Sequence, residues 1–211
     1  MHIIAQGGVS GKESEHTVPA HTFIQVQKYK VYTVPVTFTC IANAREGGNG
    51  RMSKTDKTNA MRLLDKAGIP YETLEYPSHG EAVDAGQVAL LLGEAPERIF
   101  KTLVLRGSDQ GLYACLVSGN RELDLKKAAA FFQVKSLQML AISELKDATG
   151  YVRGGCSPLG MKKALRTAVD SSALKLPYLI ISGGKIGLQL KLKADDLLKA
   201  AQAEYAALSR D

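Results

Sequence analysis

The sequence predicts an α+β fold, in which residues 52–211 form a single compact domain with a mixed β-sheet surrounded by helices. Two observations carry this prediction. Segments with helical spacing alternate with strand-like segments from Met52 to the end of the chain. Several of the strand-like segments are joined by short glycine-containing turns, which produce antiparallel hairpins and not the helical crossovers of a parallel sheet.

The predicted helices are recognised by apolar spacing and by residues suited to their ends. In the first helix, apolar residues recur at helical spacing from Ala60 to Ala67, Thr58 can cap the start, and Gly68 can end it. Asp124 and Ser143 are suited to the starts of two later helices. The helices are expected over residues 58–67, 83–92, 123–132, 143–147 and 195–208.

The predicted strands are short and mostly apolar. Residues 99–105 and 112–117 flank the turn Gly107–Gly111 and form the clearest hairpin. Residues 178–182 form an apolar strand, and a tight glycine-rich turn leads to the alternating residues 188–192. Two further strands are expected at residues 69–76 and 168–170.

Composition indicates a globular protein with an anionic partner. The chain has 211 residues, of which 45% are hydrophobic, and its formal net charge of +6 gives a pI near 9.2. Such a charge favours nucleic acid or phosphate as a partner. The sequence lacks an apolar run of the roughly 20 residues that span a bilayer, and its start lacks the pattern of a secretory signal. We therefore expect a cytoplasmic protein with no membrane partner.

Cysteine and histidine are too few and too scattered to predict a zinc site. The three cysteines Cys40, Cys115 and Cys156 form no C-x-x-C pair, which favours a reducing compartment. Three of the four histidines lie within the first 21 residues, so that His79 alone remains in the body of the chain. We expect neither a metal nor a cofactor.

Residues 1–51 differ from the rest, because they contain a few apolar runs but no helical period. One interpretation is a disordered extension. A sharper hypothesis is a mis-assigned translated leader, with translation starting at Met52. Glu46-Gly47-Gly48 can be encoded by a purine run that resembles a bacterial ribosome-binding sequence, and only three codons separate it from Met52. A mass of the native protein that begins at Met1 would contradict this hypothesis.

A glycine-rich loop at residues 150–163 is the first candidate site. Gly154 and Gly155 allow close approach of a ligand to the backbone, and Ser157-Pro158 predicts a turn. Cationic residues flank this backbone, namely Arg153, Lys162 and Lys163. Free N–H groups beside cations suit a phosphate, a carbonyl or a developing oxyanion. The alternative is an ordinary glycine-rich connection.

Lys101 is the strongest single candidate for chemistry. It interrupts the apolar strand at residues 99–105, and a half-buried lysine needs a partner or a purpose, unless it simply faces solvent. The turn Ser182-Gly183-Gly184-Lys185 is a second place suited to an anion, although it also fits a simple hairpin. His79 has no evident acid partner, and Cys156 is better explained as a small apolar filler than as a nucleophile.

Four segments follow one another along the chain: FKTLVL (100–105), LDLKK (123–127), GYVRGGCSPLG (150–160) and SGGKIGLQL (182–190). In this order they resemble the YbaK/EbsC family of aminoacyl-tRNA deacylases, which includes the editing domain of bacterial prolyl-tRNA synthetases. The resemblance begins near Lys57 and leaves residues 1–51 uncovered. It implies a barrel-like mixed sheet and trans-editing of Cys-tRNA(Pro), in which the substrate's own thiol cleaves the ester as a cyclic thiolactone. Prolyl-tRNA synthetase is implied as a transient partner.

The resemblance also implies roles for individual residues. Lys101 matches the essential lysine, and Gly154 matches the glycine whose backbone holds the terminal adenosine and the substrate carbonyl. Substrate binding is expected of Tyr76, Thr102, Gly155, Ser157, Ser182, Gly183 and Gln189. Apart from the resemblance, the local excess of positive charge over residues 153–175 predicts tRNA binding by Arg153, Lys162, Lys163 and Arg166.

One departure from the family pattern bears on specificity. Gln189 stands where Cys-tRNA(Pro) deacylases of this family carry an aspartate, so the amide keeps hydrogen-bonding capacity but lacks the charge. Two alternatives therefore stay open beside Cys-tRNA(Pro) deacylation. One is deacylation of another small aminoacyl-tRNA, and the other is a non-catalytic module that binds aminoacyl-tRNA or a synthetase.

Overall fold

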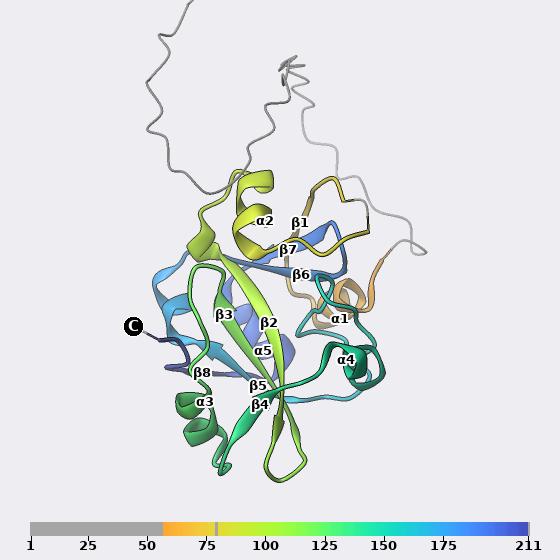
Figure 1. Ribbon diagram of the computed structural model, residues 1–211. Helices are drawn as coiled ribbons and strands as arrows, with labels where there is room; N and C mark the ends of the chain where they lie inside the picture. Colours follow the sequence, from red (N-terminus) through yellow and green to blue (C-terminus); the bar gives the residue numbers. More distant parts are fainter. Residues whose placement is uncertain (1–56, 79, 211) are drawn as a thin grey trace, which may run out of the picture. The chain divides into compact units, whose positions relative to one another are not determined.

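The computed structural model describes residues 57–78 and 80–210, which contain one eight-stranded sheet and five α-helices (Figure 1). The hypotheses about residues 1–51 and about His79 concern parts of the chain outside these residues. Within them, no helix has both the length and the apolar character needed to span a bilayer.

The sheet mixes parallel and antiparallel pairs, which confirms the predicted α+β class. Its strands are β1 (Glu72–Glu75), β2 (Ile99–Gly107), β3 (Leu112–Ser118), β4 (Leu137–Met139), β5 (Arg166–Asp170), β6 (Leu179–Lys185), β7 (Leu188–Leu192) and β8 (Glu204–Ala206). Their order is β1-β7-β6-β2-β3-β5-β8, with β4 added on β2. The pairs β2–β6, β3–β5 and β5–β8 are parallel, and the other pairs are antiparallel.

Strand β2 is the strand on which the sheet is built. It pairs with β3 over most of its length, from Phe100 to Arg106. On its other side, its start pairs with β6 and its end pairs with β4. No ladder between the described residues joins β1 to β8, so the barrel-like sheet is not closed by hydrogen bonds.

The helices begin and end largely where the sequence predicts. They are α1 (Asn59–Ala67), α2 (Ala85–Leu92), α3 (Leu125–Phe132), α4 (Ile142–Thr149) and α5 (Ala194–Ala201). Thr58 Oγ1 accepts a hydrogen bond from the Met61 N–H at 3.3 Å, and Gly68 ends α1 in the left-handed conformation. The expected cap at Ser143 is wrong, because α4 already begins at Ile142 and leaves Ser143 inside its first turn.

The closing helix is much shorter than predicted. Helix α5 ends at Ala201, where Gln202 adopts a left-handed conformation, and β8 then pairs in parallel with β5. The carboxylate of Asp170 holds the next residues extended, because its Oδ2 accepts the N–H groups of Leu208 and Ser209 at 2.9 and 2.8 Å. This long-range anchor overrides the amphipathic spacing that favoured a helix to residue 208.

The helices bury separate parts of the sheet. Helix α1, through Met61 and Leu64, and helix α5, through Leu197, pack against apolar residues of β6 and β7. α3 packs through Phe132 on β2, β3 and β5. Helix α2 packs through Val88 on Ile99 at the start of β2, so its N-terminus lies beside that part of the strand.

Candidate active site

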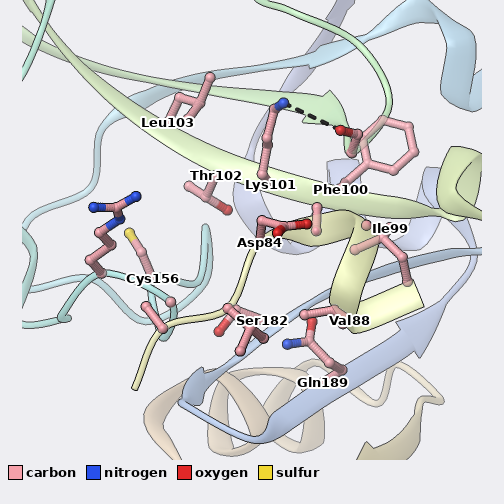
Figure 2. A pocket seen from close by; sticks show the side chains of 17 residues that line it. Asp84, Val88, Ile99, Phe100, Lys101, Thr102, Leu103, Cys156, Ser182 and Gln189 are labelled. Atoms are coloured by element: carbon pink, nitrogen blue, oxygen red, sulfur yellow. Dashed lines mark hydrogen bonds between the residues drawn. The ribbon is translucent and has the colours of Figure 1, made fainter. Parts of the chain in front are cut away.

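A cavity of about 370 Å³ lies beside the first half of β2 (Figure 2). Its lining comes mainly from four segments: residues 99–103 of β2, residues 82–88 at the start of α2, residues 153–156 of the glycine-rich loop, and Ser182 with Gln189 from the paired strands β6 and β7. Its volume falls within the ~300–1,000 Å³ typical of small-molecule sites.

Lys101 is positioned at this cavity by the sheet and by two carbonyl groups. Its backbone pairs with Val117 of β3, and its Nζ donates hydrogen bonds to the carbonyl oxygens of Arg121 at 2.7 Å and Gly119 at 3.5 Å. Figure 2 shows the second of these bonds. Partial burial lowers the pKa of Lys101, and the negative charge of Glu122 opposes this effect. The side chain is a cation fixed at the cavity wall.

The glycine-rich loop is held in shape by internal hydrogen bonds. The Tyr151 hydroxyl donates to the Leu159 carbonyl at 2.7 Å, the Gly155 N–H donates to Val152 at 3.0 Å, and the Lys162 N–H donates to Thr149 at 3.0 Å. Among the described residues, no acceptor engages the Gly154 N–H. Of the two adjacent glycines, Gly154 is therefore the one with a donor available for a ligand.

The two glycine-rich segments contact one another. A Cβ on Gly155 would lie 3.2 Å from the Ile186 nitrogen, and one on Gly184 would lie 2.9 Å from the Tyr151 ring. On the other side, a Cβ on Gly154 would lie 2.6 Å from the Ala82 Cβ. The loop thus packs between residues 182–187 and the segment that leads into α2, and absence of side chains permits both contacts.

Three further polar side chains line the cavity. Thr102 Oγ1 is buried without a hydrogen-bond partner among the described residues, which is uncommon for a buried hydroxyl. Gln189 is only 4% exposed, and no hydrogen bond from the described residues engages its amide. Asp84 caps α2 by accepting the Gln87 N–H at 3.0 Å. Of the described lining residues, Asp84 alone is acidic, whereas Lys101 and Arg153 are cationic.

The cavity lacks an activated protein nucleophile among its described residues. Cys156 lines it, but burial raises the pKa of its thiol to about 11, so the thiol is protonated at neutral pH. Neither a histidine nor a carboxylate forms a hydrogen bond to this sulfur among the described residues. The Lys101 ammonium and the Gly154 N–H are suited to bind a carbonyl group and to stabilise the negative charge that develops on its oxygen.

Comparison with known proteins relates the chain to tRNA editing. Residues 79–200 match the family described as the aminoacyl-tRNA editing domain. An Enterococcus faecalis protein with the provisional name Cys-tRNA(Pro)/Cys-tRNA(Cys) deacylase EbsC is 39% identical over 153 residues, which cover 72% of this chain and 93% of that protein.

The chain belongs to the YbaK/EbsC family of aminoacyl-tRNA deacylases.

Two other similar proteins have names that refer to prolyl-tRNA synthetase. A crystal structure described as a candidate trans-editing enzyme for prolyl tRNA synthetase superposes with a TM-score of 0.64 at 28% identity, covering 71% of this chain and 94% of that one. The proline–tRNA ligase of Kosmotoga olearia is 30% identical over 144 residues, which cover 67% of this chain. The match spans only 25% of that ligase.

The structure brings six of the predicted site residues of this family member to the cavity. They are Lys101, Thr102, Arg153, Gly154, Ser182 and Gln189. Ser182 and Gln189 face one another because they are register partners in the β6–β7 pair. The pairing of these two adjacent strands therefore places both residues at the same wall of the cavity.

Other predicted residues lie behind or outside the cavity. Tyr76 is buried in the core against Val88 and Ile99, and its N–H donates to Gly187 at 2.9 Å. Ser157 is fully buried and its Oγ accepts the Leu159 N–H, so it shapes the loop. Gly155 and Gly183 pack against neighbouring segments, which explains the lack of side chains there.

The predicted tRNA-binding residues divide into two places. Lys162 and Lys163 are exposed at the end of the glycine-rich loop. Arg166 lies at the far end of β5, opposite Tyr113, where its guanidinium donates to the Phe132 carbonyl at 3.1 Å and stacks on the Phe132 ring. Arg166 thus has a structural contact of its own, apart from the cavity.

Sequence reasoning missed the contribution of residues 82–88. Asp84 carries a detectable signal, because an aspartate directly before a helical run is a common N-cap. Its place in the cavity depends on the contact between Ala82 and Gly154, which joins segments about 70 residues apart in the chain. The sequence around Asp84 gives no information about that contact.

Proposed function

We propose that this family member deacylates Cys-tRNA(Pro), and that the thiol of the bound cysteine cleaves its own ester. The observation that carries the proposal is the composition of the cavity. It combines groups that stabilise negative charge, Lys101 and Gly154, with a Cys156 thiol that is protonated at neutral pH. A substrate that brings its own nucleophile fits such a site. The printed name of the Enterococcus faecalis relative supports the same choice of substrate.

The proposed reaction needs no external reagent. The cysteine sulfur of the substrate attacks the ester carbonyl carbon, a C–S bond forms, and the bond from that carbon to the ribose oxygen breaks. The thiol proton ends on the ribose oxygen, which leaves as the free terminal hydroxyl of the tRNA. The other product is a cyclic cysteine thiolactone, which water opens to cysteine.

Each proposed role follows from the position of a group. The Gly154 N–H donates to the carbonyl oxygen while that oxygen gains negative charge, in the manner of an oxyanion hole. The Lys101 ammonium strengthens this stabilisation, because the partly buried site has a lower dielectric than water. Thr102 Oγ1 and the Gln189 amide supply hydrogen bonds to the aminoacyl group or the terminal adenosine.

The proposal extends to macromolecular partners. The exposed cations Arg153, Lys162 and Lys163 lie along the segment that borders the cavity, where they can bind phosphates of the tRNA acceptor end. A transient encounter with prolyl-tRNA synthetase would deliver the mischarged tRNA.

A deacylation panel tests the substrate. Cys-, Ala-, Ser- and Pro-tRNA(Pro), together with Cys-tRNA(Cys), are incubated with the protein, and the loss of each ester is followed against a reaction without protein. We expect Cys-tRNA(Pro) to be hydrolysed fastest. Faster hydrolysis of Ala- or Ser-tRNA(Pro) would favour the alternative that Gln189 motivates, a deacylase for another small amino acid. Tight tRNA binding without any hydrolysis would favour a non-catalytic module.

The Cys156→Ala variant tests the source of the nucleophile. The variant should keep most of the deacylation rate, because the attacking sulfur belongs to the substrate. Cys115→Ala is a suitable control, because Cys115 is also buried but lies in a different part of the core. A loss of several orders of magnitude in the Cys156 variant alone, with the fold intact, would assign the nucleophile to the protein.

A further inference from the structure

We propose that Asp84 is the residue that recognises the α-ammonium group of the aminoacyl ester. This inference rests on the proposed function to the extent that the cavity receives the aminoacyl end of a tRNA. In every such ester an α-amine lies beside the carbonyl carbon. This amine is cationic below its pKa of about 8. A cavity that binds it next to the cations Lys101 and Arg153 needs a compensating negative charge.

Asp84 is the group that can supply this charge. It is the one acidic residue among the described residues that line the cavity, and the lining residue Gln189 of β7 is neutral. Figure 2 shows Asp84 among the lining side chains, beside the start of α2 and below Lys101 in this view.

The carboxylate is held in a defined position. Its Oδ1 accepts the Gln87 N–H at 3.0 Å as the cap of α2, while its Oδ2 has no hydrogen bond from the described residues. Gly86 leaves room for the carboxylate, because a Cβ there would lie 3.1 Å from Oδ1. One oxygen thus fixes the side chain, and the other is available to a ligand.

The position relative to the glycine-rich loop fits recognition of an α-amine. Ala82, two residues before Asp84, contacts Gly154, whose N–H is proposed to hold the ester carbonyl. In an aminoacyl ester the amine nitrogen is two bonds from the carbonyl carbon. We therefore place the carbonyl at Gly154 and the ammonium of the same amino acid at Asp84, which belongs to the segment that contacts this glycine.

Binding of two stable analogues tests this role without any catalytic step. One is 3′-deoxy-3′-(L-alanylamino)adenosine, whose amide resists cleavage and whose amine is charged at pH 6.5. The other is the lactyl analogue, in which a hydroxyl replaces the ammonium. We expect the wild-type protein to prefer the alanyl analogue. Asp84→Asn keeps a good helix cap and should weaken alanyl binding at least tenfold, while lactyl binding changes less than twofold.

The matched control is Asp124→Asn, which makes the same change at the N-cap of α3, outside the cavity. It should leave the affinity for both analogues unchanged. Equal weakening of both analogues by Asp84→Asn, or no preference of the wild-type protein for the ammonium, would overturn the proposal. Because neither analogue contains a thiol, failure of Cys-tRNA(Pro) as the substrate leaves this test intact.

Discussion

At the scale of single residues, Gly154 shows how backbone geometry and packing select one amino acid. Its φ of +81° lies in the left-handed region, which a side chain occupies only with strain. Its Cα also approaches the segment before α2 so closely that a Cβ would overlap Ala82. Both constraints act at the place where the loop, the cavity and the Asp84 segment meet.

Replacing Gly154 by alanine should therefore distort the site as well as strain the backbone. We expect Gly154→Ala to displace the Ala82 segment and to lower the deacylation rate about 100-fold, since small misplacements in a site cost about that much. Gly68→Ala is the matched control, because Gly68 has a φ of +65° but open space around its Cβ position. That control should lose about 1–2 kcal/mol of stability from backbone strain and keep full activity. Comparable rates for the two variants would contradict this role of Gly154.

The candidate site could be predicted from sequence where chemistry stands out locally. Lys101 interrupts an apolar strand, and Gly154 belongs to a loop rich in glycine, so both have a signal in their immediate neighbours. Tyr76 and Ser157 have the same kind of signal, yet they are buried and support the site from behind. Asp84 was missed because its place in the cavity comes from a contact with a loop about 70 residues away.

At the scale of elements, Asp170 joins the end of β5 to the C-terminal segment. It is buried, and its carboxylate accepts N–H groups of Ser172, Leu208 and Ser209. Burial alone would raise the pKa of Asp170, but the hydrogen bonds from Ser172, Leu208 and Ser209 outweigh it and lower the pKa below 3.8. The folded state thus binds this proton more weakly than the unfolded state does.

This linkage predicts a pH-dependent effect of Asp170→Asn. A depressed carboxyl pKa stabilises the fold above the unfolded value near 3.8, and the stabilisation is lost as pH falls through the lower folded value. In either orientation the amide would also place its NH2 group against at least one backbone N–H, that of Ser172 or those of Leu208 and Ser209, which costs about 1–3 kcal/mol. We expect urea unfolding at pH 7 to give a much lower free energy of unfolding for Asp170→Asn than for the wild-type protein. This difference should become smaller as the pH falls below 3.8. A difference that stays constant from pH 7 to pH 3 would show that the charge contributes nothing.

The elements themselves were predictable to different degrees. Helix α1 has a cap, a periodic face and a terminal glycine in one short stretch, and its limits match the prediction closely. The segment after Ala201 also has helical spacing, but β8 forms because β5 offers an unpaired edge and Asp170 binds the following N–H groups. Residues 137–139 gave no strand signal, since β4 depends on its pairing with the end of β2.

At the scale of the whole molecule, the net charge of +6 gives a testable consequence for tRNA binding. Affinity for tRNA should fall steeply as the salt concentration rises. A plot of log K against log[salt] should become steeper by about 0.7–0.9 for each phosphate that the protein neutralises. Replacing both Lys162 and Lys163 by alanine should flatten that slope by roughly 1–2 units. Arg166→Ala is an informative comparison, because its guanidinium is already engaged by Phe132. An unchanged slope in the double variant would remove these lysines from the interface.

The central claim is that the cavity beside Lys101 performs the deacylation. Its most direct test is the single-turnover rate on Cys-tRNA(Pro) for Lys101→Ala beside the wild-type protein, with Lys101→Arg as a second variant. Arginine keeps the charge but cannot reproduce the compact ammonium that donates to the Gly119 and Arg121 carbonyls, so it should also be impaired. We predict that Lys101→Ala stays folded and binds uncharged tRNA almost normally. Its single-turnover deacylation rate should be at least 10²–10³-fold lower than that of the wild-type protein. A Lys101→Ala rate close to that of the wild-type protein would contradict the account.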